Sequence, residues 1–353
     1  MNIEINKPLP FFPEKELITY NSKSDLGESL NVLTRGDQLL VEDLYSDGLY
    51  LLHRLQGALK KKFPGKSFEE QRNYRKEYQK FSQNILLEVI NHELVVKKAP
   101  SIGWLEKLYP ENESFLLPFP QIQGLNSSWQ WYSKGVAIPG LRNKIYPYYG
   151  TYFPTRFEHL SLFDNWLKRY EGTKKAAFDI GVGSGILSLQ LIKHGFQMVF
   201  GTDTNPNAIY GLNEAWEGTK TSRKIELEYA SLFGKRTKPV ELIVFNPPWL
   251  PAGQELEGQD EAIYYNDSLF PKFFEEAYKR LLPGGKIVLL FSNLGKLTHP
   301  EFLHPIELEL EQGGRFHKEL FLQKKVKLAS DKTKRDQHWR KEEKVELWEF
   351  SKI

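Results

Sequence analysis

Short apolar runs alternate with segments of helical periodicity along the second part of the chain, from about residue 145 onward. Five apolar runs of four to six residues are typical of buried strands, at 176–181, 198–203, 225–230, 242–245 and 286–291. Helical patterns separate several of them, at 186–194, about 206–217 and about 269–281. Strands separated by helices predict βαβ units and an open parallel sheet covered on both faces.

The end of the chain breaks this alternation. Residues 320–328 and 345–350 are both strand-like, and a highly charged stretch separates them with no helical pattern. Two consecutive strands joined in this way predict an antiparallel pair that completes the sheet. The expected fold is therefore α/β and doubly wound, with a mostly parallel, Rossmann-like sheet of seven strands.

Residues 1–140 follow a different pattern, which predicts a mixed, largely helical N-terminal domain. One helix is expected over about 36–62. A second begins at Ser67, a plausible N-cap with Glu70 three residues later, which together form a capping box. Apolar residues then recur at helical spacing as far as Ile90.

Beyond His92 this periodicity ends. Residues 93–96 and 101–105 fit either short strands or loop, and 115–131, rich in Pro, Gly, Asn and Ser, predicts a packed connector. A length of 353 residues fits about two domains. We therefore expect an accessory or substrate-recognition domain over 1–140 and a second domain over 141–353.

Composition narrows the class of protein. Apolar residues make up 40% and charged residues 26%, as in ordinary globular proteins. The absence of cysteine excludes disulfides, thiolate catalysis and cysteine-ligated zinc. Neither a signal-peptide pattern nor an apolar run of about 20 residues is present, so we expect a cytoplasmic protein without a membrane contact.

Positive charge is concentrated in two stretches. Residues 54–80 hold nine Lys or Arg against three Glu, and residues 315–344 hold eleven against five acidic residues, so each has a net charge of +6. Such stretches are commonly solvated faces. The alternative is contact with an RNA-rich or acidic partner.

A glycine-rich turn follows the first strand of the predicted sheet. Asp179 precedes Gly181, Gly183 and Gly185, and glycines at a strand-to-helix turn allow a ligand to approach the backbone closely. Asp203 ends the second strand, 22 residues after Gly181. An acid there suits the two hydroxyls of a ribose, although it also fits the N-cap of the next helix.

The fourth strand ends in Asn246-Pro247-Pro248-Trp249. Two consecutive prolines end the strand, because neither has an N–H for a ladder hydrogen bond. Their carbonyls remain acceptors beside an amide and an aromatic face. This arrangement suits a planar substrate with an –NH2 group.

The glycine turn, Asp203 and the Asn-Pro-Pro-Trp tetrad occur in the order found in class I S-adenosylmethionine-dependent methyltransferases. Over about residues 146–295 the chain resembles the HemK-like release-factor glutamine N-methyltransferases, which carry Asn-Pro-Pro-aromatic. The segment 149–158 is similar to the one that lies over the cofactor in that family. Adenine-amino methyltransferases share the same tetrad.

The resemblance implies the following roles. Asp179 would hold the methionine ammonium of S-adenosylmethionine, the Gly181–Gly185 backbone would lie against the cofactor, and Asp203 would bind its ribose. Asn246 and the Pro247 carbonyl would bind the substrate –NH2, with Pro248 and Trp249 against the planar group. Asn246 would also contact the cofactor. Ser231 stands where many members have an acid that contacts adenine.

Arg156 and Glu158 predict either a salt bridge that closes a loop over the glycine turn or a lid that contacts cofactor or substrate. The chemistry needs no metal. The spacing of His159, His299 and His304 fits no ligand cluster and favours surface or capping histidines.

Two kinds of methyl acceptor remain open. The first is a glutamine or asparagine side chain in a protein, such as a translation factor or ribosomal protein. The second is an adenine or other base amine in RNA or DNA, reached through the basic stretches 54–80 and 315–344. A non-catalytic binding module and a dinucleotide oxidoreductase are more remote alternatives.

Overall fold

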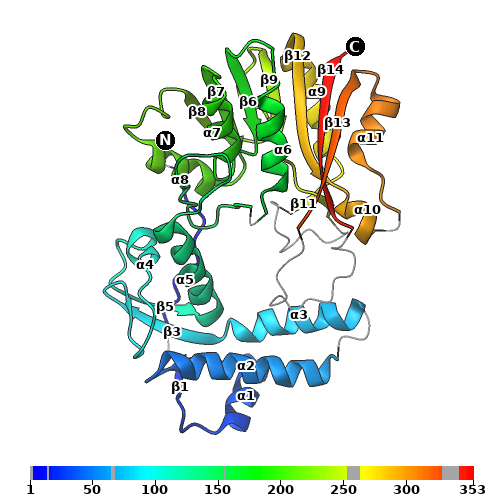
Figure 1. Ribbon diagram of the computed structural model, residues 1–353. Coiled ribbons are helices and arrows are strands. Elements are labelled where there is room, and N and C mark those ends of the chain that lie inside the picture. Colours follow the sequence, from blue (N-terminus) through cyan, green and yellow to red (C-terminus); the bar gives the residue numbers. More distant parts are fainter. Residues whose placement is uncertain are drawn as a thin grey trace. The chain divides into compact units, whose positions relative to one another are not determined.

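The computed structural model describes residues 3–13, 16–64, 68–154, 156–252, 263–299, 301–327 and 342–353. The chain divides into two compact units (Figure 1). The N-terminal unit spans Asn6–Lys134, and the C-terminal unit holds the remainder, including the short segment that precedes Asn6. The division falls six residues before the predicted end of the N-terminal part.

A seven-stranded sheet forms the centre of the C-terminal unit. Its spatial order is β13-β14-β12-β9-β6-β7-β8. The strands in chain order are β6 (Ala176–Ile180), β7 (Met198–Asp203), β8 (Ile225–Tyr229), β9 (Val240–Phe245), β12 (Leu281–Ser292), β13 (Phe316–Lys325) and β14 (Lys344–Lys352). Neighbouring strands are parallel except that β14 runs antiparallel to both β12 and β13. The predicted doubly wound fold, with its antiparallel C-terminal strand pair, is confirmed.

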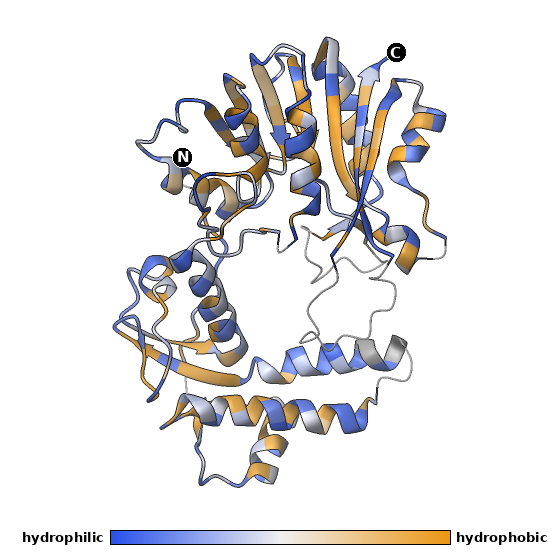
Figure 2. Cartoon of the chain, in the orientation of Figure 1, coloured by the Kyte–Doolittle hydropathy of each residue, from blue (hydrophilic) through white to orange (hydrophobic). Residues whose placement is uncertain are grey.

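Alternating side chains of the central strands enter two separate hydrophobic cores. In β9, Leu242 and Val244 belong to one core while Ile243 and Phe245 belong to the other. Because successive side chains of a strand point to opposite faces, a strand buried on both faces is apolar throughout. Figure 2 shows these central strands largely in the hydrophobic colour.

Helices cover both faces of this sheet. α6 (Glu158–Leu167) and α7 (Ile186–Lys193) contribute to the first core, and α9 (Leu269–Arg280) contributes Phe270, Phe273 and Phe274 to the second. The other helical segments are α8 (Pro206–Trp216), α10 (Leu294–Thr298), α11 (Pro305–Leu308) and the π-helical turn η1 (Glu309–Gly313). A two-residue pair, β10 (Leu250–Pro251) with β11 (Tyr264–Tyr265), follows β9.

The N-terminal unit combines helices with a five-stranded sheet. Its strands are β1 (Ile18–Tyr20), β2 (Leu39–Val41), β3 (Ile85–Ile90), β4 (Glu93–Leu94) and β5 (Ser114–Pro118). Its helices are α1 (Leu26–Arg35), α2 (Tyr45–Lys62), α3 (Phe68–Ser82), α4 (Trp104–Leu108) and α5 (Phe119–Lys134). None of the described helices of the chain is both long and apolar enough to cross a membrane.

Several predictions for this unit were wrong. The helix expected over 36–62 begins only at Tyr45, since residues 39–41 form a buried strand between β1 and β3. The helix expected to reach Ile90 ends at Ser82, because the β-branched and apolar run 85–90 pairs with β2 and β5. Ser67, the predicted N-cap, lies outside the described residues.

The stretches 101–105 and 115–131, predicted as short strand or loop and as a connector, differ from those predictions. Residues 104–108 form a helix rather than a strand or loop. The expected connector 115–131 consists of the buried strand β5 and most of α5. Trp104 contacts Trp129 and Tyr132 in this region, so these aromatic residues pack within the N-terminal unit.

Candidate active site

Three neighbouring strands bring the predicted site residues to one edge of the sheet. In the register of β6, β7 and β9, Ile180 is level with Thr202 on one side and Phe245 on the other. The next residue of each strand is Gly181, Asp203 and Asn246. Adjacent strands lie about 4.8 Å apart. The glycine turn is therefore flanked by Asp203 on one side and the start of the tetrad on the other.

Asp179 is a fully buried carboxylate in this arrangement. Its Oδ2 accepts a hydrogen bond of 2.6 Å from the Ser188 hydroxyl, while its Oδ1 is buried without a partner. Burial raises the pKa of Asp179 to about 7, Ser188 opposes that rise, and the nearby charge of Asp203 adds to it. An unpaired buried carboxylate oxygen fits a cationic ligand such as an ammonium group.

The glycine turn is held directly by the second acid. The Asp203 Oδ2 accepts from the Gly183 N–H at 2.8 Å, and its Oδ1 accepts from the Asn205 N–H at 2.8 Å. Burial raises the pKa of Asp203, and these two backbone hydrogen bonds oppose the rise. Each carboxylate oxygen keeps acceptor capacity for a ligand hydroxyl. The N-cap of α8 is Asn205, so the alternative prediction of Asp203 as this N-cap is wrong.

The three glycines have positive φ angles of 65°, 50° and 75° at Gly181, Gly183 and Gly185. A Cβ at Gly185 would also lie 2.6 Å from the Trp216 ring. This position therefore requires glycine for both its conformation and its packing against α8. A Cβ at Gly183 would lie 3.5 Å from the Tyr152 carbonyl oxygen, an ordinary contact distance, and Gly181 at the start of the turn is exposed.

The tetrad lies at the carboxyl end of β9, with Asn246 and Trp249 both partly exposed. The Trp249 Nε1–H donates to the Asn246 Oδ1 at 3.2 Å. The indole also packs against both hydrophobic cores of the C-terminal unit. Asn246 thus presents a polar side chain whose orientation a neighbouring aromatic residue holds.

The histidines differ from the expectation in part. His304 is the N-cap of α11, but it is buried and its Nε2 lies 3.2 Å from the Glu346 Oε2. His159 is neither a surface nor a capping residue. It is 2% exposed, and its ring meets Trp249 edge to face at 5.5 Å between centroids. Burial lowers the pKa of His159 to about 4, against the opposing charge of Glu158.

Arg156 and Glu158 do not form a pair with each other. The Arg156 guanidinium donates to the Glu343 carboxylate at 2.5 Å, and Glu343 is buried just before β14. The Glu158 Oε1 accepts from the Lys327 N–H at 3.2 Å, just after β13. Arg156, just before α6, and Glu158, its first residue, are therefore bonded to residues that lie just before β14 and just after β13.

Ser231 is exposed just after β8, and its carbonyl accepts from the Gly234 N–H at 3.1 Å. It follows the strand next to Asp203, which places it near the predicted ribose position. Its role toward adenine stays a prediction.

Two features of the site were missed in the sequence. Ser188 donates a hydrogen bond to Asp179. The sequence feature that could have identified Ser188 is its position as a polar residue inside the apolar helix 186–193. The side-chain amides of Asn205 and Asn207 donate to the carbonyls of Gly150 and Tyr149, each at 2.8 Å. These bonds fix the segment 149–150 against the start of α8. The two segments are far apart in the sequence, so only the structure shows that they are in contact.

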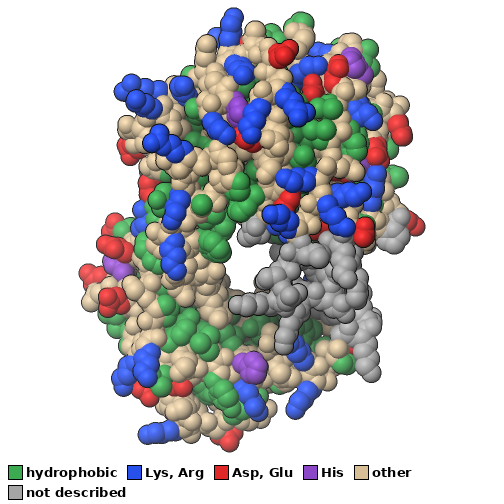
Figure 3. All heavy atoms as spheres, in the orientation of Figure 1, with side chains coloured by type: hydrophobic (Ala, Val, Ile, Leu, Met, Phe, Trp, Pro, Cys, Tyr) green, Lys and Arg blue, Asp and Glu red, His purple; other side chains and the backbone are tan. Residues whose placement is uncertain are grey.

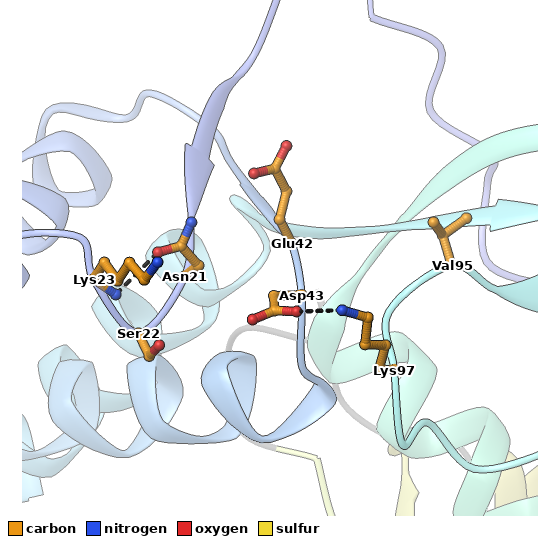
Figure 4. A pocket seen from close by; sticks show the side chains of 7 residues that line it. All are labelled: Asn21, Ser22, Lys23, Glu42, Asp43, Val95 and Lys97. Atoms are coloured by element: carbon orange, nitrogen blue, oxygen red, sulfur yellow. Dashed lines mark hydrogen bonds and ion pairs between the residues drawn. The ribbon is translucent and has the colours of Figure 1, made fainter.

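A separate hollow lies in the N-terminal unit (Figure 4). It is lined by Asn21, Ser22, Lys23, Glu42, Asp43, Val95 and Lys97. Its charged groups include an exposed ion pair of 3.0 Å between Asp43 and Lys97. None of the predicted site residues lines this hollow.

Residues 161–304 match the family described as the methyltransferase small domain. A protein of Methanocaldococcus jannaschii, provisionally named a protein N5-glutamine methyltransferase, is 27% identical over 188 residues, which cover 51% of this chain and 91% of that protein. A ribosomal protein L11 methyltransferase of Lachnospira eligens is 40% identical over 58 residues, 16% of this chain and 18% of that protein. The solved ribosomal protein L11 methylase of Lactobacillus delbrueckii subsp. bulgaricus is 18% identical, with a TM-score of 0.40 over 61% of this chain and 90% of that one.

With this sheet order and this family match, the C-terminal unit is a class I methyltransferase domain. The chain is an S-adenosylmethionine-dependent methyltransferase. The unpaired Asp179 oxygen fits the ammonium group of this cofactor, and the exposed Gly181 offers backbone that the cofactor can approach. The cofactor supplies an electrophilic methyl group on a sulfonium.

Proposed function

We propose that this enzyme transfers a methyl group to the side-chain amide nitrogen of a glutamine or asparagine in a protein. The observation that carries the proposal is the position of Asn246, partly exposed at the end of β9 and level with the glycine turn. The named similarity to a protein N5-glutamine methyltransferase supports a protein as the acceptor.

The acceptor nitrogen of an amide is planar, and its lone pair is delocalised into the carbonyl group. Asn246 Oδ1 and the Pro247 carbonyl would accept the two N–H groups of this nitrogen. Two fixed acceptors orient the lone pair and stabilise the positive charge that develops on the nitrogen during transfer. The leaving thioether is neutral, so no general acid is needed.

The roles of the remaining residues follow the same proposal. Asp179, the glycine turn with Gly181, Gly183 and Gly185, and Asp203 would hold the cofactor, with Ser231 near its adenine. Pro248 and Trp249 would bound the planar acceptor. Arg156 would act through its ion pair with Glu343, by holding the segment that leads into α6.

A base amine in RNA is the second candidate. Trp249 offers a large face for stacking a base, and exposed lysines 60–62 end α2 within the basic stretch 54–80. Within 315–344, residues 328–341 lie outside the described part of the chain. On the visible face of the C-terminal unit, Lys and Arg side chains are spread out with acidic side chains among them (Figure 3). On this face, that distribution favours ordinary solvated surface over a nucleic-acid groove.

Transfer of a tritiated methyl group into a cell lysate tests the choice of acceptor. The labelled material is divided and digested with protease or with nuclease. Label released only by protease is the expected result, and acid hydrolysis should then yield methylamine from a methylated amide. Label released only by nuclease would replace this proposal with the base-amine function.

Asn246→Ala tests the acceptor site in the same assay. Loss of an oriented acceptor in the transition state should lower kcat by about 100-fold or more. The Kd for S-adenosylmethionine, measured by calorimetry, should change by less than about twofold, because the carbonyl oxygen that is removed is directed at the substrate. Asp203→Ala is the matched variant with the opposite expectation, weak cofactor binding. Normal turnover by Asn246→Ala would refute the proposed role.

A further inference from the structure

We infer that Trp249 is a positioning residue that fixes the side-chain amide of Asn246 with its carbonyl oxygen as the acceptor for the substrate. This inference rests on the proposed function, because it assigns a role within the acceptor site. The role depends on the hydrogen bond from the indole N–H to Asn246, and neither phenylalanine nor tyrosine has a ring N–H that could replace it.

Asparagine has two nearly isosteric ends with opposite hydrogen-bonding roles. Its Oδ1 accepts, whereas its Nδ2 donates. If the amide of Asn246 turned over, an –NH2 group would face the –NH2 group of the substrate, and two donors cannot bond to each other. Transfer therefore requires a neighbouring group that stabilises one of the two orientations of the amide.

The indole of Trp249 is that neighbouring group. Nε1–H of tryptophan is a donor without an acceptor function, so its bond of 3.2 Å selects the Oδ1 of Asn246. A carbonyl oxygen has two lone pairs, so Oδ1 can still accept an N–H of the substrate. Phenylalanine would retain an aromatic face but lose this selection.

Elsewhere in the chain the backbone performs the same task. The Oδ1 atoms of Asn21, Asn205 and Asn266 each accept from the N–H two residues later, at 2.9 to 3.1 Å. This local turn is the usual partner of an asparagine side chain outside helices and strands. Two residues after Asn246 stands Pro248, which has no N–H. The tetrad thus removes the ordinary local partner, and Trp249 replaces it one residue further along.

The indole is itself held in place. His159 lies edge to face against it with an interplanar angle of 90°, and both ring nitrogens of His159 are buried without a partner in the described structure. His159 therefore contributes here through ring packing. Trp249 also contacts both hydrophobic cores, which further restricts the plane of the indole.

Trp249→Phe tests this positioning in the full-length enzyme. The methyl acceptor in this assay is the lysate material whose label is released by protease. It is used at saturating and at limiting amounts. Loss of the orienting hydrogen bond should lower kcat about tenfold. The amount of acceptor for half-maximal rate and the cofactor Kd should change by less than about twofold, since most of the aromatic contact remains.

Trp166→Phe is the matched control. Trp166 is buried, and its Nε1–H donates to Glu349 Oε2 at 2.7 Å outside the site. This variant should lose some thermal stability but keep kcat. His159→Ala should lower kcat by removing support from the indole, and His159→Phe should restore it, since a ring is returned without ring nitrogens.

If Trp249→Phe is too unstable to assay, benzothienylalanine at position 249 keeps the shape of the indole and replaces its N–H by sulfur. The same loss of kcat is expected there. Full kcat in either variant, or an effect confined to the half-saturating amount of acceptor, would overturn the positioning role. Absence of transfer by the unaltered enzyme would instead refute the proposed function, so the two failures are distinguishable.

Discussion

At the residue scale, the most unusual group of the proposed site is the buried carboxylate of Asp179. Asp179 has one oxygen bonded to Ser188 and one without a partner, and it is fully buried. A buried carboxylate without a cation destabilises the folded protein when it is charged. Such a group is tolerated where a ligand completes its hydrogen bonding. Asp179 therefore connects cofactor binding with the pH dependence of stability.

Asp179→Asn should change how stability depends on pH. The pKa of Asp179 rises from an ordinary value of 3.8 to about 7 on folding, so the folded state holds its proton more tightly than the unfolded state. Without cofactor, this group therefore lowers stability progressively as the pH rises from about 4 to about 7. The asparagine variant lacks this loss, so its advantage over the unaltered protein should grow between pH 5 and pH 8.

Urea unfolding at those two pH values, without cofactor, measures the difference. Asp267→Asn is the control, because Asp267 is an exposed acid in the same unit. Parallel pH profiles for the unaltered protein and Asp179→Asn would show that Asp179 has an ordinary pKa.

At the scale of elements, the sequence predicted the C-terminal unit far better than the N-terminal one. β9 is buried along its length and β12 is buried from Ile287 to Ser292, so the apolar runs 242–245 and 287–291 are easily recognised. In the N-terminal unit, the apolar spacing that continues from α3 into β3 conceals the break after Ser82. Three-residue strands such as β2 gain their stability from neighbours distant in sequence, which no local pattern contains.

The predicted site residues were placed from strand ends, and the structure brings the glycine turn, Asp203 and Asn246 together in one register. The sequence could not show that Arg156 pairs with Glu343, because 187 positions separate them. It also could not show that His159 lies against Trp249. Such contacts depend on how α6 packs on the finished sheet.

The Arg156–Glu343 pair should couple two distant elements energetically. Arg156→Ala leaves a carboxylate unpaired whose side chain is only 4% exposed. We expect a double-mutant cycle of Arg156→Ala and Glu343→Ala to give a coupling energy of about 1–3 kcal/mol. Thermal or urea unfolding of the four proteins provides the measurement. The exposed pair of Lys279 and Glu275 is the control and should show no measurable coupling. Additive effects at Arg156 and Glu343 would contradict this link.

At the scale of the whole molecule, each unit has its own sheet and its own buried residues. The C-terminal unit carries all of the proposed site, and its cores draw on strands and helices of that unit alone. The N-terminal unit supplies none of these residues, so a role in recognising the acceptor is the proposal that remains for it. The two activities, cofactor binding and acceptor recognition, should then be separable.

A chain of residues 135–353 tests this separation. It should fold and bind S-adenosylmethionine with a Kd close to that of the full-length enzyme, because the cofactor residues and both cores are retained. Ile3 packs against Val182, Ile209 and Leu212 in the full-length protein, so its removal should cost on the order of 1–2 kcal/mol of stability. Ile3→Ala in the full-length chain is the control for that loss.

Transfer to the protease-sensitive acceptor should fall at least tenfold in the shortened chain, about the effect of losing 1.4 kcal/mol of binding. The Ile3→Ala variant should retain full transfer, which separates a loss of stability from a loss of recognition. If the shortened chain methylates the acceptor at the full rate, recognition belongs to the C-terminal unit alone, and the surface around Trp249 becomes the place to seek it.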